Sequence, residues 1–168
     1  ADDVRAIAPD VVIVATGSFP RMDGRQLYVP GEIAGGLELP HVVSSHDLLL
    51  EGSNRNWGTR ALVYDDVGHY EGLAAAEYLI EQGLAVTYAT GQISVAPKLE
   101  PSLSVDPALE RLAKGDFRVM TRAKLVSVAK ERATVAYRYG GAPVEVEADT
   151  VVFISHNLPN RELLDELQ

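Results

Sequence analysis

Residues 60–91 follow the pattern of a strand, a turn, a helix and a second strand, and this pattern constrains the fold more than any other feature of the chain. The segments 60–64 and 84–89 are rich in apolar β-forming residues, and the helical pattern between them runs to Gln82. Gly83 then stands where a C-cap glycine ends a helix. A parallel pair of strands joined by a helix is the right-handed crossover unit. The sequence therefore predicts the layout of a dinucleotide-binding unit.

The segments on either side extend this unit into an α/β domain. The further predicted elements are a buried strand at 10–15, an irregular connection at 19–43, a short helix at 44–50 capped by Ser44 or Ser45, a loop at 91–105, a helix at about 106–114, a strand at 117–120, a meander at 123–129, 133–139 and 144–147, a buried strand at 149–154 and a terminal helix at 160–167. The predicted fold class is α/β: a Rossmann-like three-layer NAD(P)-binding-type domain with a parallel sheet and an antiparallel β-meander.

The charge and the amino-acid composition of the chain exclude several kinds of binding partner and chemistry. The 168 residues carry a formal charge of −9. A nucleic-acid surface or an anionic-membrane surface needs clustered Lys and Arg, so neither partner is expected. The chain has no Cys, which excludes disulfides, thiol catalysis and a Cys-ligated iron–sulfur cluster within it. No segment is apolar over the ~20 residues of a membrane span, and we expect a cytoplasmic protein.

Three motifs flank the crossover unit in a fixed order. Residues 9–20 read PDVVIVATGSFP, residues 29–31 read VPG, and ADTVVFI at 148–154 is followed by PNRELL at 159–164. In this order they resemble the pyridine-nucleotide–disulfide oxidoreductase fold, in which a NAD(P)-binding domain is inserted into an FAD-binding domain. The resemblance covers nearly the whole chain.

Residues 63–79, VYDDVGHYEGLAAAEYL, resemble one branch more closely. This branch is the NADH:flavin oxidoreductase/trimethylamine dehydrogenase-like family, which includes histamine dehydrogenase and 2,4-dienoyl-CoA reductase, and the resemblance is to its carboxy-terminal portion. It implies a parent flavoenzyme with FMN and an iron–sulfur cluster, and possible ADP, FAD or NAD(P)H binding. The implied partners are the remaining domains of that enzyme and an electron-transfer protein. The abrupt start of the chain is what we expect of a piece of a longer protein.

The resemblance also implies a division of the chain. Residues 1–20 would contribute a strand to an absent FAD/ADP-binding-type domain, and residues 21–58 would form a connection. Residues 59–147 would be the NAD(P)-binding-like domain, and residues 148–168 would return to the FAD/ADP-type domain.

The turn after the first strand departs from a working phosphate loop. In Gly-x-Gly-x-x-Gly the first glycine permits the tight turn, the second admits the pyrophosphate and the third packs helix on strand. The corresponding residues here are Val67, His69 and Gly72. Val67 tolerates positive φ badly, and the His69 side chain would occupy pyrophosphate space. Asp65 and Asp66 add negative charge beside the site; alternatively, they cap the helix themselves.

Three glycines are the candidate cofactor-binding residues: Gly17, Gly68 and Gly72. Gly17 is a candidate for close backbone approach to a cofactor, although a plain turn glycine has the same sequence signature. The acidic residue expected about 20 residues after the loop to bind a ribose hydroxyl is missing, since the second strand ends Ala-Thr-Gly at 89–91. The sequence thus retains the architecture of a dinucleotide site without most of its phosphate chemistry.

The adjacent residues His69, Tyr70 and Glu71 invite an acid/base interpretation. We favour the alternative that they fill the emptied loop, because no nucleophile or metal-ligand spacing accompanies them. No catalytic residue and no metal ligand is therefore assigned, and whether this segment alone is an enzyme stays open.

Two functions remain. The first is a structural or partner-docking module of a flavin-dependent amine dehydrogenase or reductase, with a degraded dinucleotide loop. The second is a functional NAD(P)H-binding domain that delivers hydride to a flavin. A free-standing interaction domain unrelated to redox chemistry fits the flanking motifs less well.

Overall fold

A five-stranded parallel sheet forms the centre of the molecule. The computed structural model covers residues 1–168. The strand order is β2-β9-β3-β4-β5, and every pair is parallel. The strands are β2 (Val42–Val43), β3 (Arg60–Asp65), β4 (Ala85–Ala89), β5 (Phe117–Met120) and β9 (Thr150–Ile154). The predicted crossover unit at 60–91 is confirmed as β3, α3 and β4.

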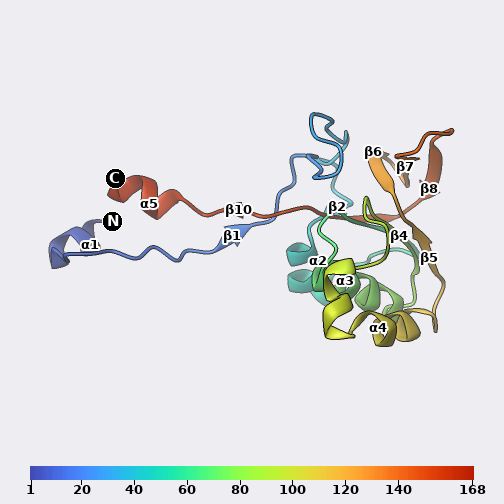
Figure 1. Ribbon diagram of the computed structural model, residues 1–168, viewed down its shortest axis with the longest axis horizontal. Helices are drawn as coiled ribbons and strands as arrows, with labels where there is room; N and C mark the ends of the chain where they lie inside the picture. Colours follow the sequence, from blue (N-terminus) through green and yellow to red (C-terminus); the bar gives the residue numbers. More distant parts are fainter.

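Helices cover one face of this sheet and a β-meander covers the other (Figure 1). The helices are α2 (Ser45–Glu51), α3 (Tyr70–Glu81) and α4 (Val105–Leu112), with 3-10 turns η1 (Gly52–Asn54) and η2 (Pro97–Ser102). The meander consists of β6 (Ala123–Ala129), β7 (Arg132–Tyr137) and β8 (Val144–Glu147), which pair antiparallel in that order. The predicted three-layer α/β fold is confirmed.

The side chains of each strand alternate between the two faces of the sheet, and a separate hydrophobic core lies on each face. In β3 the side chains of Ala61 and Val63 pack with the helices, whereas those of Leu62 and Tyr64 pack with the meander. Successive side chains of a strand point to opposite faces, so a strand covered on both sides must be apolar throughout. This requirement explains the continuous apolar runs in β3 and β9.

Helix α3 buries one face against the sheet. Leu73, Ala75, Ala76 and Leu79 are buried. Ala74 is exposed, because it faces away from the sheet. Gly83 has a φ of +86°, the left-handed conformation expected just after a helix.

The two ends of the chain run side by side away from the three-layer body (Figure 1). We call this part the tail. Its elements are α1 (Asp2–Ile7), β1 (Ser18–Phe19), β10 (Leu158–Pro159) and α5 (Glu162–Leu167), and β1 pairs antiparallel with β10. No helix in the structure combines the length and the hydropathy that crossing a bilayer requires.

The strand predicted at 10–15 does not form in this structure. The segment pairs with no strand, and Val11 and Ile13 are 76% and 88% exposed. A strand needs a neighbour for its backbone groups and a layer for its side chains, and the tail supplies neither. Assignment of residues 1–20 to another domain stays a prediction.

The position of β9 in the sheet differs from the domain boundary predicted at residue 148. The sequence placed 148–168 in a segment that returns to another domain, but β9 lies inside the sheet between β2 and β3. Pairing on both edges makes β9 a central strand of the body. The chain therefore leaves the body after Ile154 and Ser155 rather than before β9.

Ser44 is the N-cap residue of helix α2. The Ser44 hydroxyl accepts the Asp47 N–H at 3.1 Å, and the Asp47 carboxylate accepts the Ser44 N–H at 3.0 Å, which is a capping box. Ser44→Ala should lower the free energy of unfolding by about 1 kcal/mol. Urea unfolding of both proteins measures the change. Ser53→Ala, at an exposed position, is the control, and equal stability of the two variants would contradict the cap.

Candidate functional site

The candidate site lies where β3 ends and α3 begins. In a crossover unit of this kind, N–H groups of the turn and the positive end of the helix dipole meet a pyrophosphate here. Asp65 is the last residue of β3, and α3 begins at Tyr70 after the N-cap residue His69. His69 makes no side-chain cap hydrogen bond, so the free N–H groups of the turn need another acceptor.

Asp65 is that acceptor. Its Oδ1 accepts the N–H groups of Val67 at 2.8 Å and Gly68 at 2.9 Å, and its Oδ2 accepts the Tyr88 hydroxyl. The side chain is fully buried. Burial raises the pKa of Asp65, and the hydrogen bonds from Tyr88 and the two N–H groups oppose that rise. A carboxylate of the chain thus binds two N–H groups of the turn beside the place where a phosphate would lie.

The two loop glycines are required by contacts within the chain. A Cβ on Gly72 would lie 2.7 Å from Cγ of Asp65. Gly68 has a φ of +73°, and a Cβ there would lie 2.9 Å from Nε2 of Gln92. Gly72 is therefore small because Asp65 packs against the helix start. A cofactor-binding role for Gly68 and Gly72 stays a prediction, since packing alone accounts for both.

A second segment closes the loop from outside. The Lys98 N–H donates to Gly68 O at 3.1 Å, and Gln92 Nε2 donates to Val67 O at 3.3 Å. The Tyr28 hydroxyl donates to Gln92 Oε1 at 2.6 Å. Gln92, Val95 and Ala96 are buried in this position. The volume beside the carboxyl ends of β3 and β4 is filled by side chains and backbone of residues 92–98.

Asp66 performs a different task from Asp65. Its Oδ2 accepts the Leu27 N–H and lies 3.4 Å from the Ser155 hydroxyl, while Oδ1 has no partner. Burial raises its pKa, and the hydrogen bond from Leu27 opposes the rise. Through Leu27 and Ser155, Asp66 therefore joins the connection that follows β1 to the end of β9. For the acid pair the sequence left open charge beside a phosphate or capping of the helix from within; Asp65 binds the turn at 67–68, and no side chain caps α3 itself.

The buried tyrosines next to these acids are structural. Burial raises the pKa of Tyr88, and the charge of Asp65 adds to the effect. Burial likewise raises the pKa of Tyr64, which stacks on Phe153 with ring centroids 5.7 Å apart. Both phenols stay neutral at physiological pH. Sequence reasoning missed Tyr88 and Tyr28. Tyr88 stands near the end of the predicted strand 84–89, whereas Tyr28 lies within the irregular connection 19–43, where no local pattern marks it.

No hydrogen bond joins the side chains of His69, Tyr70 and Glu71 to one another. His69 and Tyr70 are exposed with their rings edge to face, 5.0 Å between centroids. Glu71 turns the other way and accepts the Ser45 hydroxyl of α2. No group of three or more His, Asp or Glu side chains is placed to hold a metal ion.

Gly17 lies in the tail, apart from Gly68 and Gly72 (Figure 1). Its φ is +76°, its carbonyl accepts the Asn160 N–H at 2.9 Å, and a Cβ would meet no atom within 4 Å. The structure therefore does not bring the three candidate glycines together. The role of Gly17 in binding a cofactor stays a prediction.

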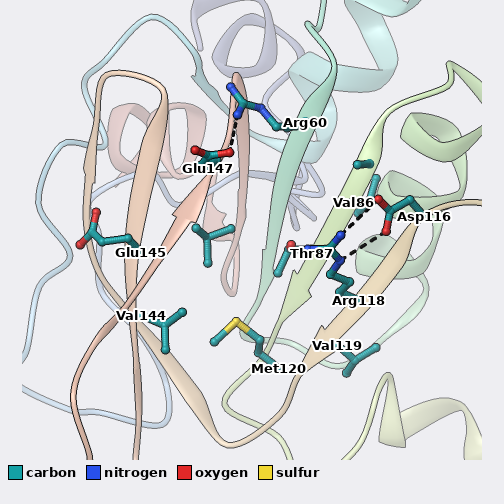
Figure 2. A pocket seen from close by; sticks show the side chains of 12 residues that line it. Arg60, Val86, Thr87, Asp116, Arg118, Val119, Met120, Val144, Glu145 and Glu147 are labelled. Carbon is teal, nitrogen blue, oxygen red and sulfur yellow. Dashed lines mark hydrogen bonds and ion pairs between the residues drawn. The ribbon is translucent and has the colours of Figure 1, made fainter.

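The largest surface pocket, about 650 Å³, lies away from the candidate site (Figure 2). It runs from the amino-terminal ends of β3 and β4 along β5 to β8. Its arginines are already paired, Arg118 with Asp116 and Arg60 with Glu147. Ligands of parallel α/β sheets bind at the carboxyl ends of the strands, so this pocket does not resemble a nucleotide site.

Comparisons with known proteins point to flavin enzymes. No protein-family model matches the chain. The probable N-methylproline demethylase of Rhizobium meliloti (strain 1021) is 32% identical over 172 aligned residues, covering 100% of this chain and 24% of that protein. The multifunctional alkene reductase/demethylase OYE of Caballeronia cordobensis is 31% identical over 157 residues, 89% of this chain and 21% of that protein.

A solved structure agrees with these relatives. The 6-hydroxypseudooxynicotine amine oxidase of Pseudomonas geniculata N1 is 28% identical and superposes with a TM-score of 0.90, over 99% of this chain and 24% of that one. The chain thus spans about a quarter of the length of the proteins that it matches.

Gly72→Ala tests the contact with Asp65. The added Cβ has no room beside the buried carboxylate, so we expect a loss of about 2–3 kcal/mol in the free energy of unfolding. In an Asp65→Gly background the same substitution should cost less than 1 kcal/mol, about the size of a surface change. Urea unfolding of the four proteins measures the coupling. Gly35→Ala, whose Cβ would lie 3.9 Å from the nearest atom, is the control. Additive costs at residues 65 and 72 would contradict the proposed contact.

The raised pKa of Asp65 gives stability a defined pH dependence. The folded-state pKa lies above the ordinary value of 3.8, so folding takes up a proton at this residue. Its contribution is fully present below that ordinary value and is lost as pH rises through the folded-state pKa. The unfolding free energy of the native chain minus that of Asp65→Asn should therefore fall as pH rises over this window. Urea unfolding across pH measures it, and a difference that grows with pH would be the opposite result.

Proposed function

Because the chain belongs to the NADH:flavin oxidoreductase/trimethylamine dehydrogenase-like family, we propose that it is a Rossmann-like module of a flavin-dependent oxidoreductase whose dinucleotide loop is closed by its own residues. Its role is structural: it packs against the catalytic parts and offers a surface to an electron-transfer partner. One observation carries this proposal. The Asp65 carboxylate accepts the Val67 and Gly68 N–H groups of the turn before α3 and so places a negative charge where pyrophosphate would approach.

A dinucleotide does not fit these residues. A phosphate at the helix start would meet a buried carboxylate and would have to displace it from two N–H groups and from Tyr88. Gln92 and Tyr28 would also have to leave, because they fill the neighbouring volume. Breaking a buried polar network costs about 3 kcal/mol or more. That cost weakens a dissociation constant by at least about 100-fold.

The parent enzyme would supply the redox chemistry. FMN and an iron–sulfur cluster belong to other segments in this proposal, because the chain has no Cys to hold a cluster. ADP or FAD would bind in a neighbouring domain. The exposed apolar segment 10–15 is the part of this chain that such a domain would cover. A cytoplasmic location fits this assignment.

The alternative is a functional NAD(P)H-binding domain that delivers hydride to a flavin. Its support is the intact crossover unit, with β3, α3 and β4 in the usual arrangement. For this function Asp65 would have to release the loop, and residues 92–98 would have to swing away. The contacts of Asp65 with Val67, Gly68 and Tyr88 oppose such an opening.

Calorimetric titration of the 168-residue chain with NADH, NADPH, ADP and FAD tests the proposal. We expect no heat of binding for NADH or NADPH at concentrations below about 1 mM. NADH binding with a micromolar dissociation constant would overturn the proposal in favour of the alternative. Asp65→Asn is titrated in parallel to remove the charge, with circular dichroism to verify its fold. Binding by this variant alone would identify the carboxylate as the block.

A further inference from the structure

A pocket of about 430 Å³ lies where the tail joins the body. We call it the neck pocket. It is formed by residues 21–33 together with His156. Arg21 stands two residues after β1, and His156 stands two residues before β10. Both connections between tail and body therefore contribute a side chain to the same cavity.

The neck pocket gathers cationic side chains on a chain whose net charge is −9. Arg21, Arg25 and His156 line it. Two carboxylates oppose them: Asp23 lies 3.5 Å from each arginine, and Glu32 is engaged by Lys124. At 3.5 Å each arginine contact is at the long end of hydrogen-bond range. One carboxylate shared between two guanidinium groups leaves the pair with an excess positive charge.

Arg21 has a donor without an acceptor. Its side chain is only 15% exposed, and its Nε is buried with no hydrogen-bond partner. Only Nη1 contacts Asp23. A buried guanidinium N–H without an acceptor costs free energy, and arginine typically presents two parallel N–H groups to one oxyanion. Because this Nε is buried, a carboxylate or a phosphate in the pocket would meet Arg21 through its terminal Nη groups.

The loop around the pocket is held in shape before any ligand arrives. Arg25 and Ile33 form an antiparallel bridge, and the Ala34 N–H donates to Gly24 O at 2.9 Å. On the far side, the Ser155 hydroxyl donates to Arg25 O at 3.1 Å and so connects the loop to the strand that precedes His156. Fixed backbone on both sides lowers the ordering cost of binding.

We propose that the neck pocket binds an oxyanion, the phosphate or carboxylate group of a small molecule, between Arg21 and Arg25 with His156 as a third polar contact. The site is separate from the closed loop at Asp65, and its existence does not depend on the function proposed above. An oxyanion here would balance the excess positive charge of Arg21 and Arg25. It would also join the two connections at the base of the tail through one ligand.

The probes are inorganic phosphate and acetate, added to the 15N-labelled 168-residue chain. We expect NMR shifts of the Arg21 Nε–H and of the His156 ring, with a dissociation constant that rises with NaCl concentration. Arg21→Gln should weaken binding at least about tenfold, equivalent to 1.4 kcal/mol. Saturable binding of phosphate alone identifies a phosphoryl ligand, and saturable binding of acetate alone identifies a carboxylate.

Two further variants keep the test decisive. Arg25→Gln alters an exposed side chain and should weaken binding severalfold without unfolding the chain. Lys114→Gln removes an exposed cation elsewhere and should leave the affinity unchanged. Absence of shifts up to about 10 mM of both anions, or equal shifts in Arg21→Gln, would overturn the proposal. Neither probe carries a nucleoside, so this outcome and that of the NADH titration are independent.

Discussion

The hydrogen bonds of one buried carboxylate determine what the centre of this molecule can do. Asp65 ends β3, the middle strand of the five-stranded sheet, accepts hydrogen bonds from the turn that follows it and binds the Tyr88 hydroxyl of β4. The helix start, the turn and β4 are therefore fixed through a single side chain. Because an unpaired buried charge is costly, each of these elements keeps its place as long as the others do. The smallness of Gly72 and the closure by Gln92 both follow from this arrangement.

Most of the body could be predicted from local pattern. Strand β3, helix α3, strand β4 and the three meander strands have periodicities or turn residues that few other folds accommodate. Ser44 caps α2 as its spacing with Asp47 indicates. The strand predicted at 10–15 does not form, because an apolar run becomes a buried strand only beside another strand. The residue pattern of a segment does not show whether such a neighbour is present. Strand β9 was placed correctly along the chain and wrongly in space, since its sheet partners are distant in sequence.

The site was predictable in part. The mismatch of Val67 and His69 with a phosphate loop, and the possibility that an acid caps the helix, both follow from residue type and spacing. The task of each acid depends on burial and direction: Asp65 binds the N–H groups of the turn before α3, whereas Asp66 binds the Leu27 N–H. The closing residues Tyr28 and Gln92 come from connections whose path no local rule fixes. A long irregular loop carries little positional information until its ends are anchored.

The paired connections at the base of the tail restrict how the body can move against anything attached there. A module joined by one flexible segment can turn freely about it, but here two segments run antiparallel and are hydrogen-bonded at β1 and β10. Rotation about their common axis would wind one around the other and break that pairing. The paired connections therefore resist torsion of the body against whatever is attached to the tail.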